Sequence, residues 1–573
     1  MRDQTMKTML WMSAVLFAAG GARAQGTTLT ASDAAPEAPK TFEYNVPGLL
    51  RVSAERFGDL RVDANARLYG QNQAIAHRLA VSPWVKLFGQ LTVKSELQLG
   101  TGYLAADVPD ERFASFGPPR ADVDAFGQDQ LALRKLFVDW RSPVGTLMVG
   151  RMASNWGLGV LTNGGDDEMQ DWGSPRLGED LNYGDVVNRA LFATAPIAMA
   201  TDAAWAKKVI LAVGADVVER DERTERQAGD DAYQVVGALR YQDQPHEAGV
   251  YVAYRSLDDR NGDTLDVVAY SLMGKSTVRR GPLELTGAGE LALVMGDTTL
   301  ARNNAYTGKI DVQQLGYVAR AGAMYLPWGV GGDLELGYAS GDSNPNDGSL
   351  RSFTFDPDYN PSLILFEQLR AAETVAAQAN ASDPERVGIP PTAARQLPSR
   401  GSVSNAIYVR PTVRYRWEDL AARVAIMWAR AEEPVVDPYN ANINGGVGVN
   451  YQGGDANEKA LGVELDAGVD YTMHFDRWAD VSLGVQAGHL FPGKAFADAS
   501  GETHPGVSLF FGKVVVKWLP DPTPPPTNTE ETATDAPVVA PAEQAGVAPA
   551  GTETPTPGSE APATPATEGS AQP

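Results

Sequence analysis

Apolar and polar residues alternate with a period of two over most of the chain, and this pattern limits the fold more than any other feature. In "WVKLFGQLTVKSELQLG", residues 84–100, long runs of apolar side chains share one parity and polar ones share the other. Such a segment is a strand with two different faces. The pattern recurs in about seventeen segments, many of 10 to 16 residues, whereas a globular strand has roughly 5 to 6. Strands of this length suit a tilted bilayer crossing.

Short and long connections between these segments take turns along the chain. Tight periplasmic turns alternating with long extracellular loops are typical of an up-and-down outer-membrane barrel. Both chain ends then lie in the periplasm, so the strand number must be even and one more strand is expected near 48–55. We predict an all-β, transmembrane, antiparallel up-and-down β-barrel of about 18 strands, with 16 as the alternative. The short connections are 141–145, 279–281, 327–329, 417–420 and 474–478, and the long ones are 101–129, 153–187, 219–231, 297–310, 341–403, 431–459 and 491–505.

Both ends of the chain differ in composition from its middle. Residues 1–24 carry basic residues, then an apolar run, then a small-x-small cleavage site, which is typical of a secretory signal peptide. Residues 25–40 are expected to be flexible. Residues 520–573 hold 13 of the 38 prolines and no basic or aromatic residue, which predicts a disordered periplasmic tail. The barrel is therefore expected at 41–519, with 341–403 as its largest loop.

Overall composition narrows the class of protein further. The chain has no cysteine and a formal net charge of −24, which argues against disulfides, thiolate-bound metals and a nucleic-acid partner. Beyond the signal peptide there is no run of about 18 apolar residues, which argues against membrane helices. The expected location is the outer membrane of a Gram-negative bacterium, with membrane lipid as a partner.

Tryptophans gather at one kind of strand end. Indole rings prefer the membrane interface, so these residues are expected to form an aromatic girdle on the periplasmic side, whereas Trp428 lies near the opposite end of its strand. The girdle residues are Trp84, Trp140, Trp205, Trp328, Trp417, Trp478 and Trp518.

Two segments resemble the alginate-export-type family of outer-membrane barrels. Residues 130–152, "QLALRKLFVDWRSPVGTLMVGRM", are similar to that family's first strong hairpin. Residues 461–496 match its closing hairpin at Gly462, Glu464, Asp466, Phe491, Pro492 and Gly493. The match covers roughly a tenth of the chain, and the tail after Trp518 departs from the family pattern. The resemblance implies a large monomeric barrel through which an anionic polymer or solute diffuses, without fixing the substrate.

The polar parity of the strands places charged residues in the predicted lumen. Guanidinium groups bind carboxylates through two parallel hydrogen bonds, and a charged wall of low dielectric selects permeants by charge. An equally weighted alternative is that these charges pair with one another and stiffen the barrel. The predicted pore-lining, anion-binding residues are Arg410, Arg414, Arg416, Arg423, Arg320, Arg240 and Arg67, and the acidic ones are Glu335, Glu464, Asp466 and Asp470. Pro411, in the same predicted strand as Arg410 and Arg414, has no backbone N–H and is expected to mark a bulge.

Neither a catalytic centre nor a metal or cofactor site is predicted. The five histidines form no H-E-x-x-H motif, and no G-x-S-x-G motif is present. Asp/Gly-rich stretches at 163–172, 257–263 and 340–348 fit no defined calcium spacing. Solvated loops are the favoured interpretation, and calcium binding stays open. The chain is predicted not to be an enzyme.

Two functions stay open at this point. One is a porin-like channel for passive passage of anionic solutes or acidic saccharides. The other is a structural or surface-binding barrel with a blocked pore, whose tail contacts periplasmic partners or the cell wall. A third hypothesis, a membrane-embedded hydrolase, lacks a visible Ser, His and acid set. The 341–403 connection is too long for a plain turn, and its helical stretch 361–381 is expected to fold inward as a constriction or outward as a lid.

Overall fold

The computed structural model describes residues 42–70, 72–107, 131–165, 184–301, 308–345, 347–382 and 397–519. The chain divides into two units, Met1–Pro522 and Thr523–Pro573, and every described residue belongs to the first. The predicted signal peptide, the flexible segment 25–40 and the C-terminal tail lie outside the described residues.

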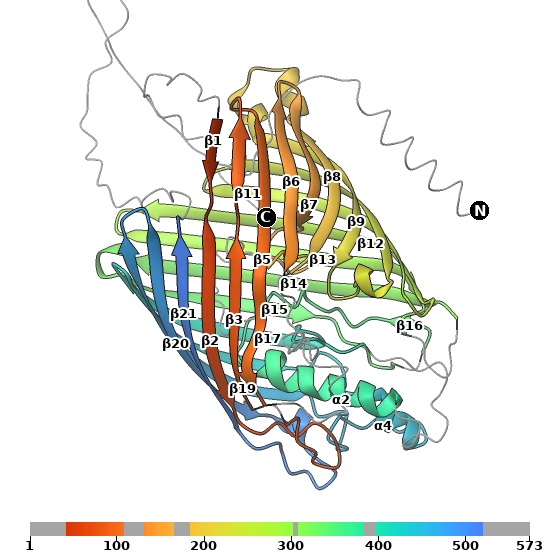
Figure 1. The fold of residues 1–573 in the computed structure, drawn as a ribbon. Coiled ribbons are helices and arrows are strands. Elements are labelled where there is room, and N and C mark those ends of the chain that lie inside the picture. The colour runs from red at the N-terminus through yellow and green to blue at the C-terminus, as the bar shows by residue number, and fades with distance from the viewer. Residues whose placement is uncertain are drawn as a thin grey trace, which may run out of the picture. The chain divides into compact units, whose positions relative to one another are not determined.

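Twenty-one strands of the described residues form one sheet, and eighteen of them close into a ring (Figure 1). Each ring strand pairs antiparallel with its neighbours in chain order, and β2 pairs with β21 to close the ring. This confirms the predicted 18-strand, antiparallel, up-and-down barrel. The ring strands are β2 (Gly48–Phe57), β3 (Gln73–Val81), β5 (Leu91–Ala106), β6 (Ala132–Ser142), β7 (Gly145–Ala153), β8 (Val186–Thr194), β9 (Val209–Arg220), β10 (Asp231–Asp243), β11 (His246–Asp258), β12 (Thr264–Arg280), β13 (Leu283–Thr298), β14 (Ile310–Tyr325), β15 (Val330–Ala339), β17 (Ala406–Trp417), β18 (Leu420–Arg430), β19 (Ala460–Phe475), β20 (Ala479–Pro492) and β21 (Val507–Trp518).

Three short strands and several short helices complete the described residues. Strand β1 (Phe42–Asn45) pairs with β4 (Trp84–Leu87), which lies in the connection between β3 and β5, and β16 (Ser349–Leu350) pairs parallel with β14. Within the described part of the chain, no helix is both long enough and apolar enough to cross a membrane. The helical elements are η5 (Pro196–Met199), η6 (Ala204–Lys208), η7 (Arg226–Ala228), η8 (Leu326–Trp328), η9 (Leu365–Arg370), α2 (Ala371–Ser382), α4 (Pro438–Ile443) and η10 (Lys494–Phe496).

Strand β2 is the strand that the parity argument placed near 48–55. Its first residue, Gly48, pairs with Trp518 at the end of β21. A Cβ at Gly48 would lie 1.9 Å from Cζ2 of the Trp518 indole, so only glycine fits beneath that ring. The strand pair that closes the ring therefore packs a glycine against a tryptophan 470 positions away in the chain.

Strand faces alternate as expected for a wall between lipid and lumen. On β11, Val250, Val252 and Tyr254 are 46%, 37% and 39% exposed, whereas Tyr251 and Ala253 between them are 7% and 6% exposed. Exposed apolar side chains with this spacing recur around the ring. A continuous apolar outer surface of this size is the lipid-facing band of a membrane barrel.

Connection lengths follow the predicted alternation with two exceptions. The β8–β9 connection on the turn side is long because it contains both η5 and η6. On the loop side, β11 and β12 are joined by only 259–263. There Asp259 accepts hydrogen bonds from the backbone N–H groups of Asn261 and Asp263, both at 2.8 Å, which closes a compact turn.

Pro411 does not mark a bulge, so that prediction was wrong. Strands β17 and β18 keep one register from Val409↔Trp428 to Thr412↔Ala425. Between these two pairs, Arg410 and Pro411 have no ladder partner on β18. On the opposite edge of β17, Pro411 stays paired with Leu334 of β15. The missing N–H therefore interrupts the ladder locally without changing which side chains face inward.

Candidate functional site

The β15–β17 connection folds into the barrel. Helices η9 and α2 lie at the end of the ring where the long loops gather (Figure 1), and the segment around them is almost completely buried. Its apolar side chains join the inward-facing residues of the wall in one core cluster, as with Phe366 against Tyr408, whose ring centroids are 6.3 Å apart. Of the two orientations predicted for 361–381, the structure has the inward one, because this apolar face packs against the wall.

Carboxylates on the wall hold this inward loop. Glu464 of β19 accepts hydrogen bonds from the backbone N–H groups of Ile364 (2.7 Å) and Leu365 (2.8 Å). Glu335 of β15 accepts hydrogen bonds from the hydroxyls of Tyr359 (2.9 Å) and Tyr408 (2.6 Å). Buried backbone donors need such partners, so these acids anchor the loop as well as lining the interior.

A second inward segment follows β7. Glu290 of β13 accepts hydrogen bonds from the backbone N–H groups of Leu158 (2.6 Å) and Val160 (3.3 Å). The Trp156 indole donates to the Ser271 hydroxyl at 3.0 Å. Asp356 accepts a hydrogen bond from the Asn163 backbone N–H at 2.8 Å, so the two inward segments are joined to each other.

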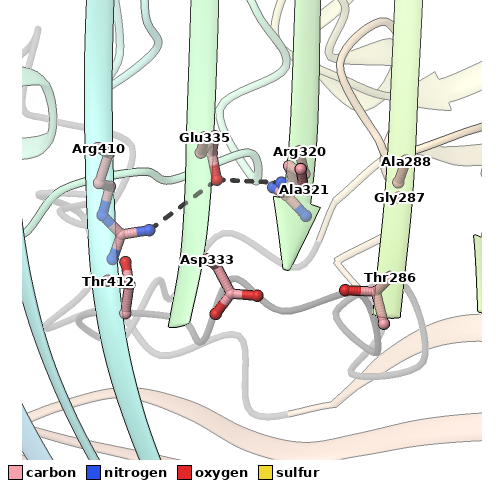
Figure 2. A pocket seen from close by; sticks show the side chains of 9 residues that line it. All are labelled: Thr286, Gly287, Ala288, Arg320, Ala321, Asp333, Glu335, Arg410 and Thr412. Carbon is pink, nitrogen blue, oxygen red and sulfur yellow. Dashed lines mark hydrogen bonds and ion pairs between the residues drawn. The ribbon is translucent and has the colours of Figure 1, made fainter. Parts of the chain in front are cut away.

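Arginines from neighbouring strands form a row on the inner face of the wall. Figure 2 shows Arg320 of β14 and Arg410 of β17 on either side of Glu335, at 3.0 Å and 4.0 Å from its Oε2. Arg414 pairs with Asp333. Arg423 of β18 lies 3.4 Å from Asp470, which Lys513 also contacts at 3.4 Å.

These four residues, Arg320, Arg410, Arg414 and Arg423, are called the arginine row below. Their carboxylate partners lie mainly on β15 and β19, the strands beside them. Across five adjacent strands, cations on β14, β17 and β18 therefore lie beside anions on β15 and β19, with β17 and β18 both carrying cations. These charges lie on the inner face of the wall and pair with one another, and their effect on permeants stays a prediction.

The other three predicted arginines lie elsewhere. Arg67 is in the β2–β3 connection, where it pairs with Asp63 and donates to Asn380 of α2 at 2.6 Å. Arg240 pairs with Glu247 near the turn end of β10. Arg416 is exposed at the turn end of β17. Strand parity alone did not separate these three arginines from the arginine row, because parity shows which face a residue is on and not how far along the barrel axis it lies.

The acidic residues also differ in position. Glu464 and Asp466 are buried on β19, at 0% and 1% exposure, beneath the inward loop. Asp470, four residues further along β19 on the same face, lies 3.4 Å from Arg423. Among the four predicted acids, Glu335 and Asp470 therefore contact the arginine row directly.

A second charged cluster surrounds Glu96, and its three cations were not among the predicted pore-lining residues. Glu96 of β5 contacts Arg134 at 2.9 Å, Lys135 at 3.1 Å and Arg78 at 3.3 Å. In the pairing of β5 with β6, Glu96 lies opposite Lys135 and Leu97 lies opposite Leu133. Arg134 therefore has no partner on β5 and is the extra residue of a bulge. A bulge re-aims its side chain, which hides Arg134 from any argument based on strict alternation.

The predicted girdle tryptophans lie at the turn ends of their strands or in the turns. Trp140, Trp205, Trp328, Trp417 and Trp478 are exposed, whereas Trp84 and Trp518 are half-buried. Their positions suit the proposed interface role.

The closed ring, its apolar outer surface and its charged interior define a transmembrane β-barrel of the Gram-negative outer membrane. No family model and no curated protein matches the sequence, so the resemblance to the alginate-export-type family stays a prediction.

Three solved structures similar to this chain come from two bacteria, and one of them is the outer membrane protein OprD. Acinetobacter baumannii OccAB1 has a TM-score of 0.45 and 11% identity, covering 83% of this chain and 96% of its own. Pseudomonas aeruginosa OccK8 (OprE) has a TM-score of 0.45 and 10% identity, covering 83% and 98%. Pseudomonas aeruginosa OprD has a TM-score of 0.43 and 12% identity, covering 82% and 92%. At these values the likeness carries no inference about the solutes of this chain.

Proposed function

We propose that the barrel is a channel for passive passage of small carboxylate-bearing solutes, including acidic saccharides. The observation that carries this proposal is the arginine row, which lies on the inner face of adjacent strands and not on the lipid face. Guanidinium groups recognise carboxylates through paired hydrogen bonds. A solute carboxylate exchanges with the resident Asp or Glu at each step, so the row offers successive weak sites.

Charge pairing within the row limits its selectivity for simple ions. Arg320 and Arg410 share Glu335, and Arg414 and Arg423 each face an aspartate. The net local charge is therefore small, and the proposed preference rests on guanidinium geometry more than on a strong positive field. We expect only a weak preference for chloride over potassium.

The inward loop supports a second candidate function, a barrel with an occluded pore. Phe353, Phe355, Ile364, Leu365 and Leu369 are at most 1% exposed, which is the packing of a core and not of a loosely held lid. In that case the barrel acts as a scaffold, and its tail contacts periplasmic partners or the cell wall.

Single-channel conductance in planar lipid bilayers tests the two functions. The full-length folded protein should give discrete openings in potassium chloride, and a soluble dicarboxylate such as succinate should reduce the current in a concentration-dependent way. Folded protein that inserts and never opens would contradict the channel and favour the occluded barrel. The ring closes within one chain, so one copy per opening is expected.

A further inference from the structure

A cavity of about 150 Å³ lies between the barrel wall and the two inward segments. One side of it is apolar and includes Val267, Val294, Val312 and Phe353. The other side is charged. A cavity of about 150 Å³ with apolar walls holds one benzene molecule in another protein, so this one has room for a single ring.

The charged side carries more anions than cations. Its four carboxylates face two arginines, Arg223 and Arg255. Arg255 is already engaged, because its Nη1 lies 2.5 Å from Asp221 and its Nη2 donates to Thr224 at 2.6 Å. The four carboxylates belong to Asp185, Asp221, Glu222 and Asp356.

Asp185 and Asp356 have neutral hydrogen-bond donors and no ion pair among the described residues. Asp185 accepts from the Thr162 hydroxyl at 2.5 Å. Asp356 accepts from the backbone N–H groups of Asn163 and Asp358, at 2.8 Å and 2.9 Å. Arg189 and Arg255 act on Asp185 only at longer range than an ion pair. Two buried carboxylates without an ion-pair partner are costly in the ionised form.

Neighbouring carboxylates increase the free-energy cost of ionising Asp185 and Asp356. Burial, followed by the charges of Glu222 and Asp221, raises the pKa of Asp185 well above its ordinary value. Burial, followed by Asp185 and Asp358, does the same to the pKa of Asp356. A cation bound between them would offset the repulsion and return both groups to the ionised form.

A metal ion fits this site less well than an organic cation. Oxygens of Asp185, Asp221 and Glu222 lie within 4.8 Å of one another. However, one oxygen of Asp221 accepts the N–H groups of Arg223 and Thr224 and the other pairs with Arg255. The apolar side of the cavity also offers nothing to a hydrated ion.

We propose that this cavity is a binding site for a small organic cation, a protonated amine carried on a single ring or a similar apolar body. The ammonium group lies against Asp185 and Asp356, and the apolar body lies against Val267, Val294 and Phe353. Buried carboxylates supply the specificity, and the apolar wall supplies burial. The site goes beyond the proposed channel, because binding there requires no open pore.

Isothermal titration of the folded full-length protein in detergent tests the site with benzylamine hydrochloride, benzyl alcohol, sodium benzoate and calcium chloride. Benzylamine should bind saturably at one site, whereas benzyl alcohol and benzoate should bind at least tenfold more weakly, roughly the value of one charged hydrogen bond. Asp185→Asn and Asp356→Asn should each weaken benzylamine by a similar factor. Asp231→Asn, at an exposed carboxylate on β10, is the matched control and should leave it unchanged.

Benzylamine affinity should also rise with increasing pH, as long as the pH stays below the pKa of the alkyl ammonium, because the two carboxylates lose their protons while the ammonium keeps its own. This measurement uses the wild-type protein, so it stands even where an Asn variant fails to fold. Equal binding of benzyl alcohol and benzylamine, unchanged affinity in both Asn variants, or calcium binding without amine binding would each overturn the proposal. None of these outcomes bears on conductance.

Discussion

Arg414 on β17 and Arg423 on β18 lie directly opposite each other in the barrel ladder. Like charges in such a position destabilise a pair of strands. Each arginine instead forms its ion pair on the side away from the other, Arg414 with Asp333 of β15 and Arg423 with Asp470 of β19. The two carboxylates offset the repulsion and leave two guanidinium groups side by side on the inner wall.

Neutralising one member of this pair should change ion preference. Arg414→Gln leaves Asp333 without its ion-pair partner, so the wall gains negative charge. We expect the potassium-to-chloride permeability ratio to rise by roughly two- to threefold, since a wall charge acts on ions in the pore through a low dielectric. Reversal potentials in a salt gradient measure it. Arg416→Gln, at the exposed end of the same strand, should cause no shift, and equal shifts in both variants would refute a special role for the row.

Glu464 should hold the inward loop in place. Glu464→Gln replaces one acceptor oxygen with an N–H₂ group that faces a backbone donor, either at Ile364 or at Leu365. The loss should be about 1–3 kcal/mol in the free energy of unfolding, with faster proteolysis of the loop near 397–403. Urea unfolding in detergent measures the first effect. Glu458→Gln, at a side chain 42% exposed, should change stability by no more than about 0.5 kcal/mol. Equal effects would argue against the anchor.

Gly48 should be required for closure of the ring. Gly48→Ala places a methyl group 1.9 Å from Cζ2 of Trp518, and such overpacking costs about 1–3 kcal/mol. The fraction of heat-modifiable, folded barrel on gels should fall. Gly237→Ala, where a Cβ meets nothing within 4 Å, is the control. Adding Trp518→Ala to Gly48→Ala should restore part of the folded fraction, and failure of this rescue would contradict the steric explanation.

Glu373 should make the inward helix α2 sensitive to pH. Burial raises the pKa of Glu373 from 4.5 to about 7, although Arg370 lies 3.2 Å away and Gln452 donates at 2.8 Å. Because the folded-state pKa is above the unfolded one, the contribution to stability is complete below pH 4.5 and is lost as the pH rises through about 7. Protease protection of α2 should therefore be higher at acidic than at alkaline pH. Glu373→Gln should remove this difference, and an unchanged pH profile in that variant would assign it to another group.

Strand number, strand faces and turn positions were largely available from the sequence. The period-two alternation reports which side chains share a face, and this holds for any strand that separates lipid from lumen. An even strand number, which is required when both chain ends lie on one side of the membrane, predicts β2. The same alternation could not show that Arg134 is the extra residue of a bulge, because a bulge breaks the periodicity on which the argument depends.

The sequence by itself determined that this chain is an outer-membrane β-barrel with arginines on the inner parity of β14, β17 and β18. Only the tertiary structure decided that the 361–381 stretch folds inward onto Glu464, and that Arg67 contacts α2 from a loop. The physical reason is range. Alternation is a property of neighbours along the chain, whereas ion pairs and loop anchors depend on strand register and on residues hundreds of positions apart.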